Sequence, residues 1–296
     1  MARQPLAEVF GFPLDNLSAE AMRHRQRRLC PFGNKVPNCT KDRAKDPLGV
    51  CSVMEGDHIV VTCPVRFRQR WLVADQAASF FFGPDCAWTS LVEVRLPERS
   101  GQSAGNIDFV LVSYDQYGRI LDFGALEVQA VYISGNVRRP FERYMQDPAG
   151  QCQMDWSGEA NYPRPDFLSS SRKRLAPQLL YKGGILHAWR KRMAVAVDSA
   201  FFATLPVLPS CSPEEADIVW LIYDLILDSA RNVYDLTHSR SIYTRFDAAL
   251  ENITRAEPGP VETFIEMLQQ RIDEKLNSSA APDAPTLADV VGGGED

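Results

Sequence analysis

The sequence predicts an α/β fold that carries a small, metal-held module near the N-terminal end. Apolar, strand-like segments alternate with helix-like ones, a pattern typical of sheets covered by helices. Residues 30–63 differ, because they are rich in glycine, proline and cysteine and show little periodicity. The chain has 296 residues, of which 45% are hydrophobic, so it can bury the core of one large domain, with or without an appended module.

Helix-like and strand-like segments follow one another along most of the chain. A helix is expected over 18–29, where Ser18 is a suitable N-cap, and a second helix over 66–82. Strands are expected over 88–96, 106–115, 121–132 and 193–198. Residues 140–182 are predicted to be loop-rich and basic.

The C-terminal part is predicted to be helical. Helices are expected over 213–230 and 261–276, followed from about residue 278 by a Ser/Ala/Pro/Gly-rich tail that is predicted to be disordered. The first helix would carry a wide apolar arc that includes Trp220 and Leu227. It is predicted either to be buried between the core and the second helix or to contribute to an interface with a second copy of the chain.

Charge is distributed unevenly along the chain. The net charge is −6, but residues 1–211 have a balance of +5 and residues 212–296 a balance of −11. No apolar run approaches the ~20 residues of a membrane span, and the N-terminus lacks the features of a signal peptide. We therefore expect a cytoplasmic protein, in which the seven cysteines are metal ligands or core thiols rather than disulfides.

The most informative segment is a predicted hairpin formed by the two central strands. Pairing these strands about Tyr117-Gly118 puts Asp108 opposite Glu127, with Cβ atoms roughly 5 Å apart on one face of the sheet. Gln129 lies two residues beyond Glu127 and points to the same face. Two carboxylates and an amide on one face suit a hard divalent cation such as Mg²⁺, which takes oxygen ligands.

Alternatives to this site remain open. A loop one residue shorter or longer would slip the register and send Asp108 to the other face, and the face could also be a solvated surface with ordinary charges. The apolar neighbours of Glu127 instead favour a strand buried on both faces, where an unpaired carboxylate would be costly. Glu93, in an otherwise apolar strand, is predicted to add a third carboxylate; alternatively it is a surface glutamate paired with Arg95.

Four cysteines in the N-terminal region are predicted to bind one structural metal ion. Cys30, Cys39, Cys51 and Cys63 are separated by 8, 11 and 11 residues, and this spacing alone also allows buried thiols. The sequence between them is too polar to fold by burial alone, and a tetrahedral thiolate site stabilises such modules. Four thiolates suit zinc or a single iron ion, and the residues do not distinguish the two. The other cysteines are predicted to be core or surface thiols: Cys86, Cys152 and Cys211.

Several separated motifs resemble those of known nucleases. Asp108 followed by Glu127-x-Gln129 resembles the PD-(D/E)xK superfamily in its Glu-x-Gln variant. The wider pattern is similar to NotI-type (NotI/EagI-like) type II restriction endonucleases, over roughly residues 8 to 200. The motifs that carry this resemblance are Phe10-Gly-Phe-Pro, Cys30-Pro-Phe, Cys39-Thr-Lys, Gly49-Val-Cys-Ser-Val, Cys63-Pro, Ser171-Arg-Lys-Arg-Leu, Lys182-Gly-Gly-Ile-Leu-His-Ala-Trp and Ala194-Val-Ala-Val-Asp.

The resemblance implies a restriction-endonuclease-like core, a mixed sheet flanked by helices, in which Asp108 and Glu127 are catalytic and hold Mg²⁺. Gln129 replaces the usual lysine and would orient a water molecule, and Glu93 would serve a second ion. The resemblance also implies a structural iron at the four cysteines, and a homodimer that cleaves double-stranded DNA at a GC-rich palindrome of the CGGCCG type. A cognate DNA methyltransferase would act on the same site. Two alternatives are a non-catalytic, metal-stapled DNA-binding protein and a repair or recombination nuclease without sequence specificity.

Basic side chains near the predicted cleft are expected to contact DNA. They are Arg138, Arg139, Arg172, Lys173, Arg174 and Lys182. Arginine can bind guanine O6 and N7 in a bidentate way, which fits a GC-rich target. Contacts of lysine and arginine with phosphates should make affinity fall steeply with salt.

The chain is accordingly expected to divide into four parts. These are an N-terminal region with the four-cysteine metal module (1–65), a nuclease core with DNA-contacting loops (66–211), a helical part (212–277) and a disordered tail (278–296). The acidic C-terminal part is expected to face away from DNA or to form a partner surface, while the basic face of residues 1–211 binds DNA.

Overall fold

The computed structural model describes residues 3–33, 37–43, 45–84 and 86–276. The chain forms two compact units, Met1–Thr254 and Arg255–Asp296. The first unit holds every described strand, and the second holds the helix α10 (Val261–Leu276), which confirms the last predicted helix. The predicted tail lies outside the described residues. None of the described helices is long and apolar enough to cross a membrane.

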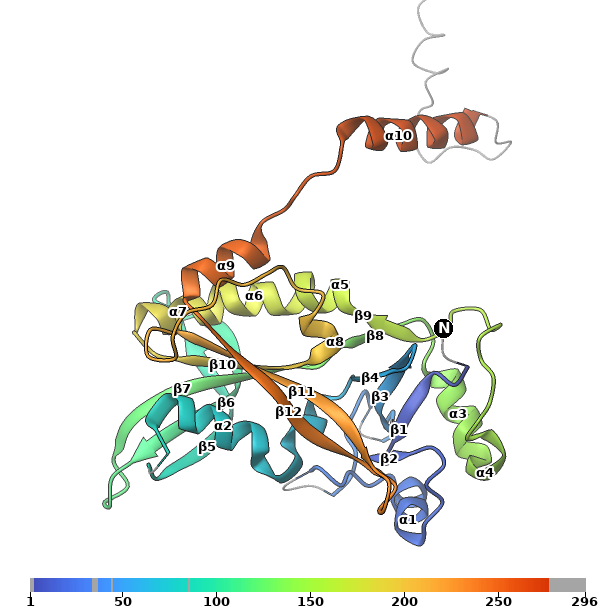
Figure 1. The fold of residues 1–296 in the computed structure, drawn as a ribbon, viewed down its shortest axis with the longest axis horizontal. Coiled ribbons are helices and arrows are strands. Elements are labelled where there is room, and N and C mark those ends of the chain that lie inside the picture. The colour runs from blue at the N-terminus through green and yellow to red at the C-terminus, as the bar shows by residue number, and fades with distance from the viewer. Residues whose placement is uncertain (1–2, 34–36, 44, 85, 277–296) are drawn as a thin grey trace, which may run out of the picture. The chain divides into compact units, whose positions relative to one another are not determined.

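A six-stranded sheet forms the centre of the first unit (Figure 1). Its strands lie in the order β12-β11-β10-β7-β6-β5. Their bounds are Trp88–Pro97 (β5), Ser103–Tyr114 (β6), Ile120–Gln129 (β7), Met193–Asp198 (β10), Ile218–Asp228 (β11) and Val233–Thr244 (β12). β10 is parallel to β7 and β11, whereas the other neighbouring pairs are antiparallel, so the sheet is mixed.

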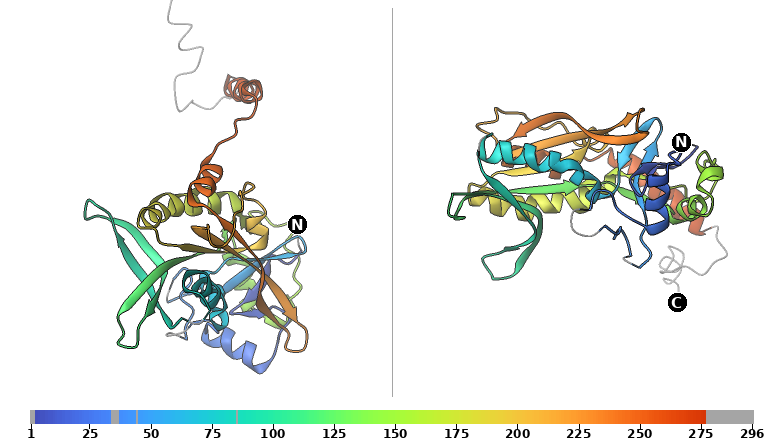
Figure 2. Two further views of the ribbon diagram at one scale, coloured as in Figure 1. Left: turned by 60° about the vertical axis from the view of Figure 1, so that its left-hand side comes forward. Right: turned by 90° about the horizontal axis from the view of Figure 1, so that it is seen from below.

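Helices cover both faces of this sheet (Figure 2). On one face, α2 (Leu72–Phe82) packs Val73, Ala77 and Phe81 against apolar side chains of the central strands. On the opposite face, α9 (Phe246–Thr254) and the helical residues 167–188 pack against the alternate side chains of the same strands. Successive residues of a strand point to opposite faces, and this alternation divides the core into two layers. Glu127 shares its face with Ala125 and therefore points toward residues 167–188.

Residues 167–188 form an almost continuous series of helical turns, so the loop predicted over 140–182 is wrong for this segment. The series consists of α5 (Phe167–Ser170), the π-helical turn η2 (Ser171–Leu175), α6 (Ala176–Gln178), a second π-helical turn η3 (Leu179–Gly183) and α7 (Gly184–Ala188). Leu175, Leu179 and Leu186 are buried at helical spacing against the sheet. Pro177 lies in the short segment α6 between the two π-helical turns.

A strand also replaces the helix predicted over 213–230. Residues Ile218–Asp228 form β11, and a continuous apolar run rich in β-branched side chains suits a strand buried on both faces. Trp220 is 0% exposed, and its Nε1 donates to Thr244 Oγ1 at 3.1 Å. The predicted helix is therefore wrong, whereas a contribution of this segment to a dimer interface stays a prediction. Much of the part predicted to be helical instead supplies two strands of the main sheet.

A smaller sheet lies on the N-terminal side, in the order β2-β1-β3-β4. Its strands are Leu6–Val9 (β1), Phe12–Pro13 (β2), Val50–Glu55 (β3) and His58–Val61 (β4). The predicted first helix is confirmed as α1 (Ala19–Arg27), with Ser18 Oγ accepting from the N–H of Ala21 at 3.3 Å. The helix predicted over 66–82 is divided into the 3-10 segment η1 (Pro64–Trp71) and α2, because Arg70 and Trp71 have φ values of 52° and 59°.

Short elements connect the main sheet to the helical face. A two-stranded sheet pairs β8 (Tyr132–Ser134) with β9 (Arg164–Asp166), and β8 follows directly after β7 in the chain. The N–H of Tyr132 donates to Ser170 Oγ at 2.9 Å, which fixes this end of β7 to α5. The remaining helices are α3 (Arg138–Gln146), α4 (Pro148–Gln151) and α8 (Ser199–Phe202).

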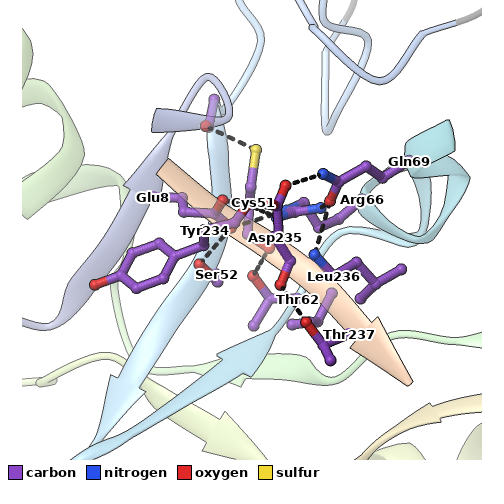
Figure 3. Close-up of polar contacts among 12 residues, drawn as sticks. Glu8, Cys51, Ser52, Thr62, Arg66, Gln69, Tyr234, Asp235, Leu236 and Thr237 are labelled. Atoms are coloured by element: carbon purple, nitrogen blue, oxygen red, sulfur yellow. Dashed lines mark hydrogen bonds and ion pairs between the residues drawn. The ribbon is translucent and has the colours of Figure 1, made fainter. Parts of the chain in front are cut away.

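A buried ion pair joins the smaller sheet to the main one (Figure 3). The side chains of Glu8 in β1 and Arg66 in η1 are both 0% exposed, and Arg66 Nε lies 3.1 and 3.2 Å from the two carboxylate oxygens. Ser52 also donates to Glu8 at 2.8 Å. The other guanidinium nitrogens donate to Gln69 Oε1 at 2.5 Å and to the carbonyl oxygen of Tyr234 in β12 at 2.6 Å. Each guanidinium nitrogen thus has an acceptor, and one of these acceptors belongs to the main sheet.

Candidate active site

The register predicted for the central hairpin is present in the structure. Phe109 pairs with Leu126, and the register is regular until Ser113, next to the turn. Continuing it by one residue in the other direction places Asp108 opposite Glu127. Asp108 is half-buried, and its Oδ2 accepts a hydrogen bond from the N–H of Val128 at 2.9 Å. This backbone contact orients the aspartate on the strand that carries Glu127.

Glu127 is almost completely buried, with only 1% of its surface exposed. Burial, and secondly the nearby Asp108, raise the pKa of its carboxyl to about 8, although Lys182 acts in the opposite direction. The Nζ atom of Lys182 lies 2.9 Å from each of the two carboxylate oxygens. A cation would stabilise the ionised form of Glu127, which burial and the neighbouring carboxylate disfavour.

Gln129 lies two residues beyond Glu127 and shares its face of the sheet. It is 5% exposed, and its Nε2 donates to the carbonyl oxygen of Ala130 at 2.8 Å. This contact fixes which end of the amide is turned toward the backbone. Its Oε1 is then the atom that can accept a hydrogen bond from a water molecule.

Glu93 lies level with Asp108 but is not assembled with it. Its neighbours Val92 and Val94 pair with Phe109 and Ile107, so residue 93 lies across from Asp108. Glu93 has a φ of 53°, which interrupts the regular strand, and it is exposed. The backbone of Glu93 is therefore level with Asp108 and Glu127 across the three strands, but its carboxylate is exposed and is not assembled with theirs.

The donor set of this site is a pair of carboxylates. Among the described residues, no group of three or more His, Cys, Asp or Glu side chains is arranged to hold a metal ion. Mg²⁺ is commonly held by one or two carboxylates, with water and substrate phosphates supplying its other ligands. Asp108 and Glu127 fit that requirement.

The sequence profile of the family described as restriction endonuclease NotI matches residues 8–236, from β1 to β12. The chain belongs to the NotI family of restriction endonucleases. This NotI-family protein is therefore a type II site-specific deoxyribonuclease, an enzyme that binds and cleaves double-stranded DNA. Restriction endonucleases generally use Mg²⁺. No curated protein was found to match the chain.

Two of the arginines predicted to contact DNA have acidic partners within this NotI-family chain. Arg138, at the start of α3, lies 2.6 Å from Asp42 and 2.8 Å from Asp46. Arg139 lies 3.3 Å from Glu159. A DNA contact by either arginine stays a prediction, and it would require the side chain to exchange a carboxylate for a phosphate.

The other predicted DNA-contacting residues lie in the helical run over the sheet. Arg172, Lys173 and Arg174 are exposed in η2, and the Arg174 guanidinium carbon is 5.0 Å from the centroid of the Tyr132 ring. Lys182 is different, because it is only 7% exposed and contacts Glu127. The contact with Glu127 was not predicted from the sequence. The sequence feature that could have indicated this contact is the uncharged Gln129. It stands where related enzymes carry a lysine, so a lysine from another element could take that place.

The four cysteines predicted to bind a metal influence one another electrostatically. Burial raises the pKa of Cys39 to about 11 and also raises the pKa values of Cys30 and Cys51, and Cys63 adds to the rise for all three. Thiolates in this region would therefore repel one another, and a bound cation would relieve that repulsion. Since the described residues contain no assembled metal group, the metal module stays a prediction.

Proposed function

We propose that this enzyme makes Mg²⁺-dependent double-strand cuts at a GC-rich palindromic site of the CGGCCG type. The observation that carries the proposal is the placement of Asp108 and Glu127 on adjacent strands, close enough for one to raise the pKa of the other. Both residues fall inside the region matched by the NotI family.

Each residue of the site has a separate role in this proposal. Asp108 and Glu127 would hold Mg²⁺, which when bound activates a water molecule and stabilises charge on the phosphate. The N–H of Val128 orients Asp108. Gln129 cannot supply a positive charge, so we assign it to orienting the attacking water through its amide. Glu93 would approach from β5 to serve a second ion.

DNA binding is proposed to require a symmetric homodimer, because one catalytic centre per chain must cut each strand of a palindrome. Arg172, Lys173 and Arg174 are exposed on the helical run that covers Glu127, so they are our first candidates for DNA contacts. Arg138 and Arg139 are second candidates, because their present partners are carboxylates. The expected biological partner is a methyltransferase that modifies the same site.

A structural iron, or zinc, is proposed at Cys30, Cys39, Cys51 and Cys63. Its support is the chemistry of four thiols that share one electrostatic environment. Elemental analysis is expected to find about one iron or zinc per chain besides Mg²⁺. Serine at any one of the four should remove this metal and lower solubility and stability, because binding and folding are coupled. The matched controls, serine at Cys86, Cys152 or Cys211, should leave the metal content unchanged; a folded, metal-free protein with full activity contradicts the site.

A plasmid digest tests the function directly. The purified enzyme is incubated with supercoiled and linear plasmids in Mg²⁺ and, as a control, in EDTA. Discrete bands that require Mg²⁺ are expected, and mapping their ends gives the recognition sequence and the overhang. A smear would indicate a nuclease without sequence specificity, and intact plasmid with gel-shift binding would indicate a non-catalytic DNA-binding protein.

A further inference from the structure

Lys182 reaches the catalytic face from the helical run that covers it. Its Nζ lies 2.9 Å from both oxygens of Glu127, and its side chain is only 9% exposed. Lysine is almost never fully buried unless it is paired. An ammonium group has three N–H donors, and Glu127 accepts from two of them in this arrangement. One donor therefore remains for another oxygen in the site.

The backbone around Lys182 is built to direct this side chain inward. Lys182 belongs to the π-helical turn η3, and such turns are rare and occur frequently at functional sites. The following residue is Gly183, where an added Cβ would lie only 2.8 Å from the ring of Phe246. Glycine at this position lets the turn pack directly on α9. On the other side, a Cβ at Gly105 of β6 would lie 3.5 Å from Lys182 Cε, so the lysine stem passes close to the strand that carries Asp108.

The strand of Glu127 lacks the positive charge that hydrolysis of a phosphodiester would use. Gln129 is uncharged, and its Nε2 is already bonded to Ala130. Negative charge develops on the phosphate during the reaction, and a positioned donor aimed at that charge lowers the barrier. Such an interaction is stronger in a buried place than in water. Among the described residues, Lys182 is the cationic side chain that contacts Glu127.

We propose that Lys182 is a catalytic residue of this enzyme. It supplies from a helix the ammonium group that the Glu-x-Gln strand does not carry, and it donates to an oxygen of the scissile phosphate while Glu127 serves as a metal ligand. The inference rests on the function proposed for Asp108 and Glu127. It assigns to Lys182 a role at the reacting atoms in place of a contact with a DNA phosphate away from the scissile bond.

The test compares Lys182→Gln with a double variant, Gln129→Lys plus Lys182→Gln. At saturating Mg²⁺, Lys182→Gln is expected to cleave at least about 100-fold more slowly than the wild type. Its Mg²⁺ affinity in calorimetry, and its DNA affinity in Ca²⁺, should stay within about threefold of wild type. The double variant returns an ammonium group to the same face of β7, two residues from Glu127, and should recover at least about tenfold of the lost rate.

A matched control is offered by the other end of β7. Lys191 Nζ lies 2.5 Å from Asp122, so Lys191→Gln also removes a lysine that is paired with a carboxylate of this strand. This variant should cleave at the wild-type rate. Glu127→Gln is measured in parallel, so that failure of the lysine assignment can be separated from failure of the site. If Glu127→Gln still cleaves, the proposed function fails; if only Lys182→Gln still cleaves, the lysine assignment alone fails.

Three outcomes overturn the role of Lys182. Cleavage by a folded Lys182→Gln within about threefold of wild type would make the lysine a counterion that the metal displaces. A loss of Mg²⁺ affinity of about tenfold or more in Lys182→Gln would show that Lys182 acts only by positioning Glu127 for the metal. If Lys182→Gln does not fold, Lys182→Met, which removes the charge and keeps an apolar side chain of similar length, takes its place. A folded Lys182→Met variant that cleaves within about threefold of wild type overturns the proposal, whereas a loss of at least about 100-fold supports it.

Discussion

Two buried ion pairs in the first unit, the Glu8/Arg66 pair and the Glu127/Lys182 pair, differ in how completely their charges are satisfied. Both join residues far apart in the chain, 58 residues in the first case and 55 in the second. Their side chains are almost equally hidden, at 0% and 0% exposure against 1% and 9%. Burial therefore does not distinguish them, and the difference lies in the neighbouring polar groups.

The Glu8/Arg66 pair is enclosed by fixed partners. Ser52 donates to the carboxylate, and Arg66 also donates to Gln69 and to the backbone of β12. Such saturation offsets the cost of taking two charges out of water. Figure 3 shows that these partners belong to the two sheets and to η1. The arrangement holds one geometry and leaves little capacity for a ligand.

The Glu127/Lys182 pair is instead placed beside a second carboxylate. Burial, and secondly Asp108, raise the pKa of Glu127 to about 8, so a cation bound here would stabilise the ionised form of Glu127. Lys182 supplies part of the compensating charge and retains a donor. A buried charge that its neighbours compensate only in part is a physical marker of a functional site. Here that charge lies on the hairpin whose register the sequence predicts.

The largest expected effect is on the rate of DNA cleavage, which should depend on the Glu127/Lys182 pair and not on the Glu8/Arg66 pair. Glu127→Gln and Asp108→Asn should each reduce cleavage by at least about 10³-fold while keeping specific DNA binding in Ca²⁺, because each removes a proposed metal ligand. Folding should be affected less, since one carboxylate remains in the cluster in either variant. Cleavage assays and gel shifts on the same preparations measure both properties.

Glu8→Gln is the matched change in the other pair. It should lower the melting temperature and reduce cleavage only in proportion to the folded fraction, because Arg66 loses its charged partner but the active site is unchanged. Wild-type cleavage by Glu127→Gln, or loss of cleavage by a fully folded Glu8→Gln, would remove the distinction between the pairs.

The second effect is on stability. Arg66→Met leaves Glu8 as a buried charge without its cation and should lower the free energy of unfolding by about 3–5 kcal/mol. Arg70→Met is the control, because Arg70 lies 3.5 Å from Asp235 with 67% of its side chain exposed. An exposed pair of this kind contributes about 1 kcal/mol or less. Equal losses for the two variants in urea denaturation would show that Arg66 is not the anchor between the sheets.

The hairpin could be predicted because two simple rules act together there. Continuous apolar runs mark β6 and β7 as strands, and the turn centre then fixes which residues face each other, including Asp108 and Glu127. The sequence predicts that Glu93 adds a carboxylate to this site, and the structure places its backbone level with Asp108. The strand pattern does not predict its φ of 53°, which arises although the neighbours on both sides keep the regular pairing.

The errors came from segments in which one-dimensional patterns are ambiguous. Residues 218–227 are apolar except for Asp224, so helical and strand periods fit about equally, and burial of residues 218–223 on both faces of the sheet decides for a strand. In the segment 167–182, Pro177 and the cluster of basic residues suggested a loop, although Leu175 and Leu179 are spaced for a helix. Lys182 was consequently expected to face DNA. Its contact with Glu127 joins residues 55 apart and arises only when the helical run covers the sheet.

The smallest predicted effect concerns pH and follows from the raised pKa of Glu127. The folded value is about 8, against 4.5 for an ordinary glutamate. Below about pH 4.5 both the folded and the unfolded chain hold this proton, so the stability linked to it is fully present. As pH rises toward 8 the unfolded chain loses the proton first, and that stability is progressively lost. Between pH 5 and 7 the loss should be on the order of 2 kcal/mol, at about 1.4 kcal/mol for each pH unit.

The measurement is the difference in unfolding free energy between the wild type and Glu127→Gln, followed from pH 5 to 8 in EDTA. This difference should shift against the wild type as pH rises, because only the wild type carries the titrating carboxyl. Saturating Ca²⁺ should flatten the curve, since a bound cation stabilises the ionised carboxylate that burial otherwise penalises. A difference that does not change with pH in EDTA would mean that Glu127 is as well compensated as Glu8. The contrast between the two buried pairs would then not support the proposed catalytic role of the Glu127/Lys182 pair.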